Sequence, residues 1–268
     1  MDRHSAIDAL QWHIDVGADE ALSVTPVDAT AMPEKKEFLS EEAPVAILGA
    51  SDAHKESLRL AKQAQTLEAL QQAIAGFEGL PLKKTATKLV FSDGNPQAHI
   101  MLVGDVPDAE EDRFGKPFAG TGGQLLDIIF SYIGLGRHNE DPAKAVYMAN
   151  ILNWRPPGSR SPLASEIEVS LPFIEKHIAL VRPQMLVLAG GVATKALLGE
   201  SASISKLRGK FYEYRPVTAG LFDTPPVVIP ALAIYNPAHL LNTPSQKRQV
   251  WQDMLQLVQK RRAHLIQQ

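Results

Sequence analysis

The hydrophobic residues of this chain form runs and stripes that alternate along its second half. Continuous apolar runs predict four buried strands, near residues 98–103, 145–152, 184–189 and 227–235. Apolar residues spaced three and four positions apart predict helices near 122–134, 164–181, 191–199 and 244–264. Alternating strands and helices form βαβ units. We therefore expect an α/β fold, a three-layer α/β/α structure with a mostly parallel, four-stranded central sheet.

The first 76 residues follow different patterns. Residues 5–22 have helical apolar spacing, which predicts a short N-terminal helix within residues 1–22. Residues 23–56 mix Pro, Ala, Glu, Asp and Ser without sustained periodicity, as is typical of an acidic, flexible linker. Residues 57–76 are rich in strong helix formers and predict one amphipathic helix. This helix would open an α/β/α domain that spans residues 57–268.

The composition narrows the class of protein. The chain lacks both a long apolar run and a secretory signal pattern, so we expect a cytoplasmic protein with no membrane span. It has no cysteine, which excludes disulfides, thiolate chemistry and a cysteine-ligated cluster. Residues 1–80 carry 6 Lys and Arg against 14 Asp and Glu, whereas residues 81–268 carry 21 against 16. An acidic appendage is thus joined to a mildly basic core.

Polar residues follow each predicted strand. GDVPD comes after the first, Asn150 lies near the end of the second, a Gly-Gly pair follows the third and YNPAHLL ends the fourth. Open α/β sheets bind their ligands at the carboxyl ends of the strands. The glycine-rich segment at 120–123 opens a helix whose N-terminus suits an anion such as phosphate. The sequence therefore predicts a site at this edge of the sheet.

Five segments, taken in order, carry a family resemblance. They are GDVPDAEEDRFGKPFAGTGGQLLD, YMANILNWRPPGSRSP, LVLAGGVATKALLG, SISKLRGKFYEY and YNPAHLLNTPSQKRQVWQDM. In order and spacing they resemble the motifs of the uracil-DNA glycosylase superfamily, specifically its family 4 branch. The resemblance runs from about Phe77 to the end of the chain.

The chain departs from that branch where its members usually bind an iron–sulfur cluster through cysteines. The corresponding residues here are Phe77, Leu80, Trp154 and Ser170. The resemblance therefore implies a relative without the cluster, in which packed side chains fill the volume that the cluster would occupy. We expect no cofactor and no metal.

The resemblance also implies which residues bind the base. They are Gly104, Phe118 and Asn150. Phe118 would stack on the pyrimidine, and the Asn150 amide would pair with uracil O4 and N3–H.

The same resemblance implies the catalytic groups. Asp105, where the family has Glu, would orient water or stabilise an oxocarbenium-like sugar. Asp108 would share that task or cap the following segment, whereas Glu110, Glu111 and Asp112 would form a solvated acidic turn. Asn236, where the family usually has His, would donate to uracil O2, or would only form the turn that Asn-Pro favours.

A last group of residues would hold the DNA. The candidates for phosphate contacts are Arg155, Arg160, Ser205, Lys206, Arg208 and the backbone of Gly209. His239, Leu240 and Leu241 follow the final motif, where relatives insert an apolar wedge into the duplex. Alternatively, these leucines dock a helix.

The resemblance implies a monofunctional uracil-DNA glycosylase of base excision repair, which flips uracil out of DNA and hydrolyses its N-glycosidic bond. It would act as a monomer on DNA that contains uracil, in association with the nucleoid. One alternative is a glycosylase-derived lesion-binding protein with weak or no catalysis. Another is an α/β hydrolase or binding protein for a free nucleotide or nucleoside.

Overall fold

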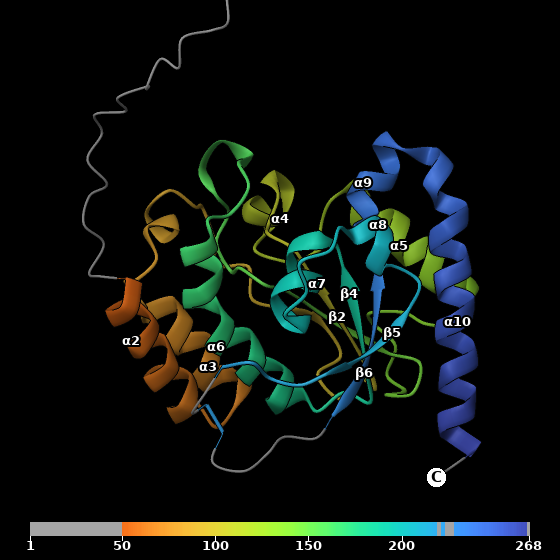
Figure 1. Ribbon diagram of the computed structural model, residues 1–268, viewed down its shortest axis with the longest axis horizontal. Coiled ribbons are helices and arrows are strands. Elements are labelled where there is room, and N and C mark those ends of the chain that lie inside the picture. The colour runs from red at the N-terminus through yellow and green to blue at the C-terminus, as the bar shows by residue number, and fades with distance from the viewer. Residues whose placement is uncertain (1–49, 219–220, 223–227, 267–268) are drawn as a thin grey trace, which may run out of the picture. The chain divides into compact units, whose positions relative to one another are not determined.

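A computed structural model describes residues 50–218, 221–222 and 228–266 of the chain (Figure 1). Its centre is a six-stranded sheet with the strand order β1-β3-β2-β4-β6-β5. The strands are β1 (Asp93–Gly94), β2 (Ile100–Gly104), β3 (Val146–Asn150), β4 (Met185–Ala189), β5 (Phe211–Tyr214) and β6 (Ile229–Ile234). The four central strands are parallel, and β1 and β5 pair antiparallel at the two edges.

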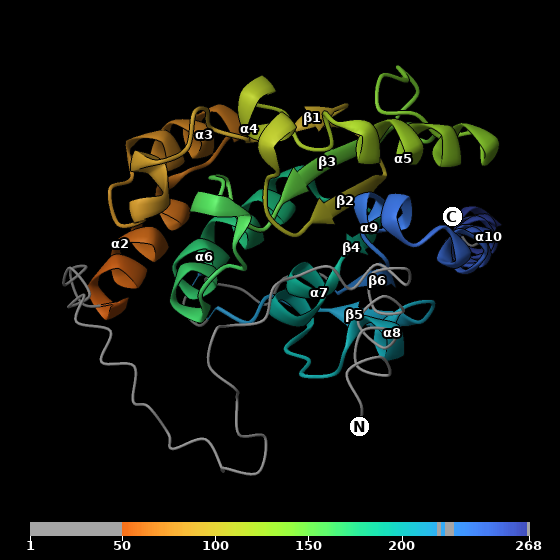
Figure 2. The same cartoon turned by 90° about the horizontal axis from the view of Figure 1, so that it is seen from above.

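Helices cover both faces of this sheet (Figure 2). The α-helices are α2 (Ala50–Gln63), α3 (Leu67–Gly76), α4 (Ala109–Phe114), α5 (Thr121–Tyr132), α6 (Ala164–Val181), α7 (Gly191–Leu198), α8 (Ile204–Leu207), α9 (Pro237–Asn242) and α10 (Lys247–Ile266). Short 3-10 helices are η1 (Pro81–Lys84), η2 (Pro157–Ser159) and η3 (Pro244–Gln246). In the described ranges, no helix has the length and apolar character needed to cross a membrane.

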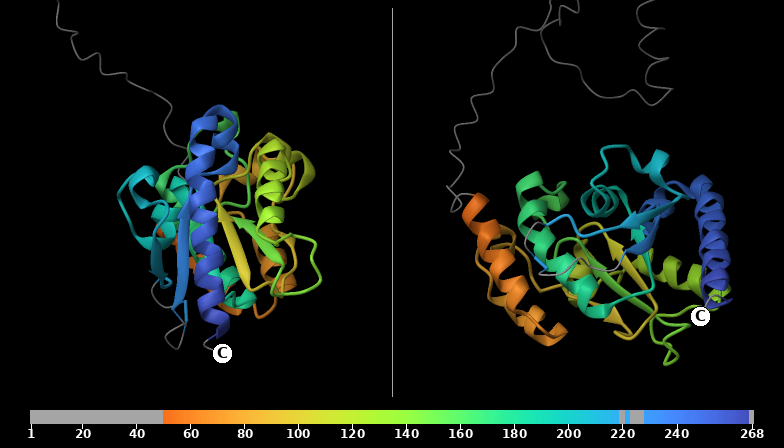
Figure 3. Two further views of the ribbon diagram at one scale, coloured as in Figure 1. Left: turned by 90° about the vertical axis from the view of Figure 1, so that its right-hand side faces the viewer. Right: turned by 60° about the horizontal axis from the view of Figure 1, so that its bottom comes forward.

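Side chains that alternate between the two faces of the central strands divide the core into two halves. In β2, Met101 and Val103 pack with α3, α6 and α7, whereas Ile100 and Leu102 pack with α5, α9 and α10. Successive residues of a strand point to opposite faces, so a strand that is apolar throughout is buried on both sides. On the face that Ile100 and Leu102 share, α10 packs along β6 and contributes Val250, Met254 and Leu257 to the core (Figure 3).

The predicted α/β/α class and the four parallel strands are confirmed, but the sheet has six strands rather than four. The two additional strands lie at the edges. β1 is only two residues long, and β5 is the segment FYEY, in which two side chains are partly buried, Glu213 is exposed and only Tyr214 is buried. Because an edge strand is short or half exposed, it leaves no continuous apolar run in the sequence.

The single helix predicted over residues 57–76 is wrong, because the structure has two helices there. Thr66 adopts an extended conformation, and its hydroxyl accepts a hydrogen bond from Ala69 N at 3.1 Å, which caps α3. The first of the two helices already begins at Ala50, inside the predicted linker. The predicted helix within residues 1–22 and the linker up to residue 49 lie outside the described residues.

The strand register aligns the carboxyl ends of the parallel strands. Gly104 pairs with Asn150 on one side and with Ala189 on the other, and Ala189 pairs with Ile234. The residues that follow these ends therefore meet at one edge of the sheet, as the sequence predicts.

Candidate active site

Side chains from segments far apart in the sequence meet in one pocket at this edge, with a volume of about 60 Å³. The pocket is lined by Asp105, Val106, Asp108, Glu111, Phe118, Gly120, Gly122, Gly123, Asn150, Asn236 and Ala238. All three predicted catalytic residues lie in this lining, together with Phe118 and Asn150. The glycines allow close packing, since a Cβ at Gly122 would lie 2.9 Å from Ala238 N.

Asp105 follows β2 and directs its carboxylate to the N-terminus of α7. Its Oδ1 accepts a hydrogen bond from Ala193 N at 2.8 Å. Gly190 has a φ of +120°, and a side chain there would overlap the carboxylate, so this position requires glycine. Burial raises the pKa of Asp105 from 3.8 to about 6, although the backbone N–H groups of residues 191–193 and the Asn236 side chain oppose the rise. The carboxylate is therefore ionised at neutral pH and becomes protonated below about pH 6.

Asn236 is the N-cap of α9. Its Oδ1 accepts a hydrogen bond from Ala238 N at 2.9 Å, so Asn236 forms the turn that Asn-Pro favours, and its donation to uracil O2 stays a prediction. The amide oxygen is thereby used, which leaves the NH₂ group as the donor. Asn236 also lowers the pKa of Asp105 through a side-chain hydrogen bond, so the two predicted catalytic groups are in contact.

Asp108 caps α4, as one of its two predicted roles requires. Its Oδ1 accepts hydrogen bonds from Glu110 N at 2.8 Å and from Glu111 N at 2.9 Å. In return, Glu111 Oε2 accepts from Asp108 N at 2.7 Å, which completes a capping box. Asp108 also lines the pocket, so capping places it beside the site.

The prediction of a solvated acidic turn at residues 110–112 is wrong for two of its three members. Glu111 and Asp112 are buried. Asp112 Oδ1 accepts from Thr87 N at 2.8 Å and from Lys88 N at 3.2 Å. Buried carboxylates need such donors, because desolvation without a partner is costly. Glu111 and Asp112 point inward because of their positions on α4. A run of three acidic residues in the sequence does not reveal which of them are buried.

Glu111 joins the residues that were predicted to bind the base. Its Oε1 accepts from Phe118 N and from Asn150 Nδ2, the latter at 3.2 Å. Burial raises the pKa of Glu111, although hydrogen bonds from Phe118, Asp108 and Asn150 oppose the rise. Sequence reasoning missed this residue. One carboxylate thus fixes both a backbone N–H and a side-chain amide of the pocket.

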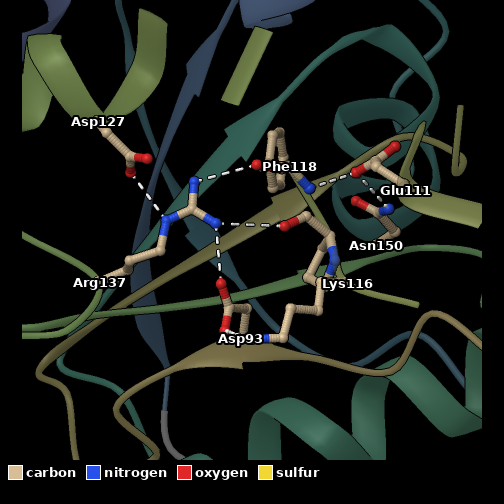
Figure 4. A network of polar contacts seen from close by, with 8 residues as sticks. Asp93, Glu111, Lys116, Phe118, Asp127, Arg137 and Asn150 are labelled. Atoms are coloured by element: carbon tan, nitrogen blue, oxygen red, sulfur yellow. Dashed lines mark hydrogen bonds and ion pairs between the residues drawn. The ribbon is translucent and has the colours of Figure 1, made fainter. Parts of the chain in front are cut away.

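Phe118 adopts a backbone conformation that residues other than glycine rarely use. Its φ is +52°, in the left-handed region. Glu111 holds its N–H, and Arg137 Nη2 donates to its carbonyl oxygen at 3.1 Å (Figure 4). A Cβ at Gly123 would overlap the Phe118 carbonyl, and a Cβ at Gly104 would overlap the Phe118 ring. Glycine at both positions gives the ring its place in the pocket.

Asn150 is the last residue of β3 and is only 2% exposed. Its Nδ2 donates to Glu111 Oε1, and its Oδ1 lies close to Gly104. This hydrogen bond orients the amide, because a carboxylate accepts from the nitrogen and repels the oxygen. One N–H and the oxygen of the amide remain for a ligand, so the pocket offers a donor beside an acceptor.

The predicted phosphate-binding segment is only partly available. The Gly209 N–H donates to Ala233 O at 2.9 Å, so it already has a partner within the chain, and the predicted backbone contact to phosphate stays a prediction. Arg208 is tied to the buried Asp253 through Nε at 3.0 Å and through Nη2, and to the Gln249 carbonyl at 2.8 Å. These bonds hold α10 against the loop before β5. Ser205 and Lys206 are exposed and keep their predicted role as a hypothesis.

Arg155 and Arg160 lie in the proline-rich loop after β3. Arg160 forms a two-pronged ion pair with Glu166 at 2.5 and 2.9 Å, and Arg155 Nη2 donates to Ser159 Oγ at 2.8 Å. Both guanidinium groups thus have partners within the chain that position the loop. Whether they also bind phosphate stays a prediction.

The predicted wedge forms α9, and its three residues differ in exposure. Leu240 is fully buried in the core on the α5 side, so its predicted contact with DNA is wrong. Its neighbour Leu241 is 41% exposed, and His239 is exposed as well. Consecutive residues of a helix point in different directions, so Leu240 faces the core while its neighbours face solvent. The sequence of the three residues alone does not reveal this.

The residues at the cluster positions do not fit an iron–sulfur cluster. Phe77, Leu80, Trp154 and Ser170 are all buried, and no residue of the chain can supply a thiolate. Phe77 packs edge-to-face on Phe173 of α6, with ring centroids 5.3 Å apart. Buried side chains thus occupy all four positions, in line with the expectation. Within the described ranges, no group of three or more His, Cys, Asp or Glu residues could hold a metal ion.

Comparison with known proteins places this geometry in a family. The family described as "Uracil DNA glycosylase superfamily" matches residues 91–255, more than half of the chain. The type-4 uracil-DNA glycosylase of Sulfurisphaera tokodaii is 34% identical over 179 residues, 64% of this chain and 77% of that protein. Its counterparts in Pyrobaculum aerophilum and Archaeoglobus fulgidus are each 30% identical, over 70% of this chain and 91% and 90% of their own lengths. The chain therefore belongs to the uracil DNA glycosylase superfamily, in the branch that resembles the type-4 enzymes.

Proposed function

We propose that this protein is a monofunctional uracil-DNA glycosylase that removes uracil from DNA and leaves an abasic site. One observation carries the proposal: an aromatic ring, an oriented amide and a carboxylate–amide pair line the same pocket at the ends of the parallel strands. Family membership supports the reaction class. The residues at the cluster positions argue for a reaction that uses no cofactor.

Recognition of the base rests on Phe118 and Asn150. The ring would stack on a flipped pyrimidine, a contact worth about 1–3 kcal/mol. The remaining N–H of the Asn150 amide would donate to uracil O4, and its oxygen would accept from N3–H. Cytosine presents the opposite pattern on this edge, so an amide held by Glu111 in this orientation favours uracil.

Bond cleavage rests on Asn236 and Asp105. As the bond between C1′ and N1 breaks, its electrons move onto the uracil ring, and the Asn236 N–H would stabilise the charge at O2. The ionised Asp105 would stabilise the positive sugar and orient the water that adds to C1′. Asp105 and Asn236 are in contact, so in one transition state Asp105 would face the positive sugar while Asn236 faces the negative base.

The DNA would lie across the same edge of the sheet. Ser205 and Lys206 are exposed and would contact phosphates, and Leu241 with His239 would enter the space left by the flipped base. We propose that the enzyme acts as a monomer, in the cytoplasm at the nucleoid.

Release of free uracil from an oligonucleotide with one uracil tests the proposal. We expect release from uracil opposite guanine or in single strands, with far less from cytosine or thymine. Binding of the uracil-containing strand without release would instead support the lesion-binding alternative. Oligonucleotides with xanthine, hypoxanthine and mismatches would define the range of bases.

A further inference from the structure

Arg137 lies behind the pocket and not in its lining. It follows Gly136 in the connection between α5 and β3, where Gly136 bridges Ala145, and it is only 7% exposed. Its guanidinium reaches three separate segments of the chain (Figure 4). A buried arginine that bonds to three segments can fix their positions. Neither the sequence motifs nor the list of pocket-lining residues indicates this role.

Two carboxylates fix the guanidinium. Nε donates to Asp127 Oδ1 at 2.8 Å, and Nη1 donates to Asp93 Oδ2 at 2.9 Å. Lys116 Nζ lies 3.4 Å from the other oxygen of Asp93 and holds that carboxylate in turn. Because the planar guanidinium carries its donors in a rigid fork, fixing two edges also fixes the direction of the third.

The third edge meets the backbone beside the pocket. Nη2 donates to the Phe118 carbonyl at 3.1 Å, and Nη1 lies 3.5 Å from the Pro117 carbonyl. On the other side of the same residue, Glu111 accepts the Phe118 N–H. The backbone of Phe118 is thus held by a cation on its carbonyl and an anion on its N–H.

This double hold matters because Phe118 has a φ of +52°. A residue with a side chain leaves the left-handed region unless its surroundings over-determine it. Relaxation to a negative φ would turn the ring away from its place over Gly104. Charged donors and acceptors form the stronger hydrogen bonds, so this pair is suited to hold a strained residue.

We propose that Arg137 is a positioning residue for the base-stacking ring, and that it acts on uracil excision through the Phe118 backbone. The inference rests on the proposed function. Arg137 does not touch the base. It fixes where the ring lies before the base arrives, so its removal slows excision without weakening contacts between the protein and the phosphates.

The test compares single-turnover excision at saturating DNA for the parental protein, Arg137→Met, Phe118→Ala and the double variant. Arg137→Met should lower the rate about tenfold, within the range of a lost stacking contact. The affinity for a uracil-free duplex should stay unchanged. In the Phe118→Ala background, Arg137→Met should cause no further loss, because the ring that it positions is already absent.

Two further variants separate positioning from stability. Arg137→Lys keeps the charge but cannot reach both carboxylates and the carbonyl with one nitrogen, so it should give a smaller loss of rate in a protein that remains folded. Glu175→Gln is the matched control. It alters a buried carboxylate that accepts from Val217 N and Thr218 N, away from the pocket lining, and should leave the rate unchanged.

The outcomes are distinct. Additive losses in the double variant, or full activity of folded Arg137→Lys and Arg137→Met, would overturn the positioning role while leaving the glycosylase proposal intact. A folded parental protein that releases no uracil would overturn the proposed function, and this inference with it.

Discussion

Two buried regions of this molecule are held together in opposite ways. The wall of the pocket depends on directional bonds, in which Glu111 and Arg137 fix the backbone of Phe118 and Glu111 orients Asn150. The region around Phe77 depends on packing. There, Ser170 Oγ and Trp154 Nε1 are buried and have no hydrogen-bond partner among the described residues.

The difference follows from what each region must do. A ring that stacks on a base and an amide that reads its edge need fixed orientations, which hydrogen bonds to charged groups supply. The region around Phe77, which packs against α6, needs only to be filled. Apolar side chains can do this, because the hydrophobic effect has no direction. A chain can therefore replace metal–ligand bonds by apolar side chains in the second region without altering the chemistry of the first.

The largest expected effect belongs to the packed region. Phe77→Ala should lower the free energy of unfolding by about 3–5 kcal/mol, because it leaves a cavity against Phe173. Excision per folded molecule should stay at the parental level. Urea denaturation and active-site titration would measure both. Ser170→Ala is the matched control in this region, with an expected change in stability below about 0.5 kcal/mol. A loss of excision without a loss of stability would contradict the separation of the two regions.

The next effect belongs to the charge-stabilising donor of the pocket. Asn236→Ala should lower the single-turnover rate by about 10²–10³, since one lost donor to a developing anion costs about 2.7–4 kcal/mol. Asn236→Asp separates the two roles of this residue, because it retains an oxygen to cap α9 but loses the amide donor. Equal rates for Asn236→Asp and the parental protein would show that Asn236 only caps the helix.

A smaller effect is expected at Glu111. Glu111→Gln should lower the rate of excision by about tenfold or more, because leaving a buried N–H poorly paired costs about 1–3 kcal/mol. It should also relax the discrimination between uracil and cytosine. Asp112→Asn makes the same chemical change one residue along, where the partners are Thr87 N and Lys88 N. If both variants lose excision equally, Glu111 has no special function in the pocket.

The smallest effect is a pH dependence. Since the pKa of Asp105 is raised to about 6, the single-turnover rate should fall about tenfold per unit as the pH drops below 6, and should level off above 7. The folded state favours the protonated form of this group. Its contribution to stability is therefore complete below pH 3.8 and is lost as the pH rises through about 6. Asp105→Asn should remove the slope, and a parental rate that is flat from pH 5 to 8 would exclude ionised Asp105 from the reaction.

Apolar runs and helical apolar spacing made the central architecture predictable from the sequence. The strands that carry Gly104 and Asn150 are continuous apolar runs, and their common edge followed from the parallel topology. Asn236 and Asp108 were recognisable because caps have local signatures. The break at Thr66 was not, since helical apolar spacing continues across it.

The orientation of polar side chains was harder to predict. Glu111 was predicted to be one of three solvated acids, and Arg137 was not singled out, because both contacts with Phe118 form only in the folded chain. Arg208 and Leu240 are further examples, because Arg208 is bonded to Asp253 and Gln249 of α10 and Leu240 is buried in the core. Burial of a charge depends on partners far along the chain, and local sequence does not contain them.

Single-turnover release of uracil by the parental protein and by Asn150→Ala, after dialysis against a chelator, tests the central claim most directly. The account predicts that the chelated parental protein excises uracil, and that Asn150→Ala loses most of this activity while it binds uracil-free duplex as before. No release by the folded parental protein, or release by Asn150→Ala at the parental rate, would contradict it.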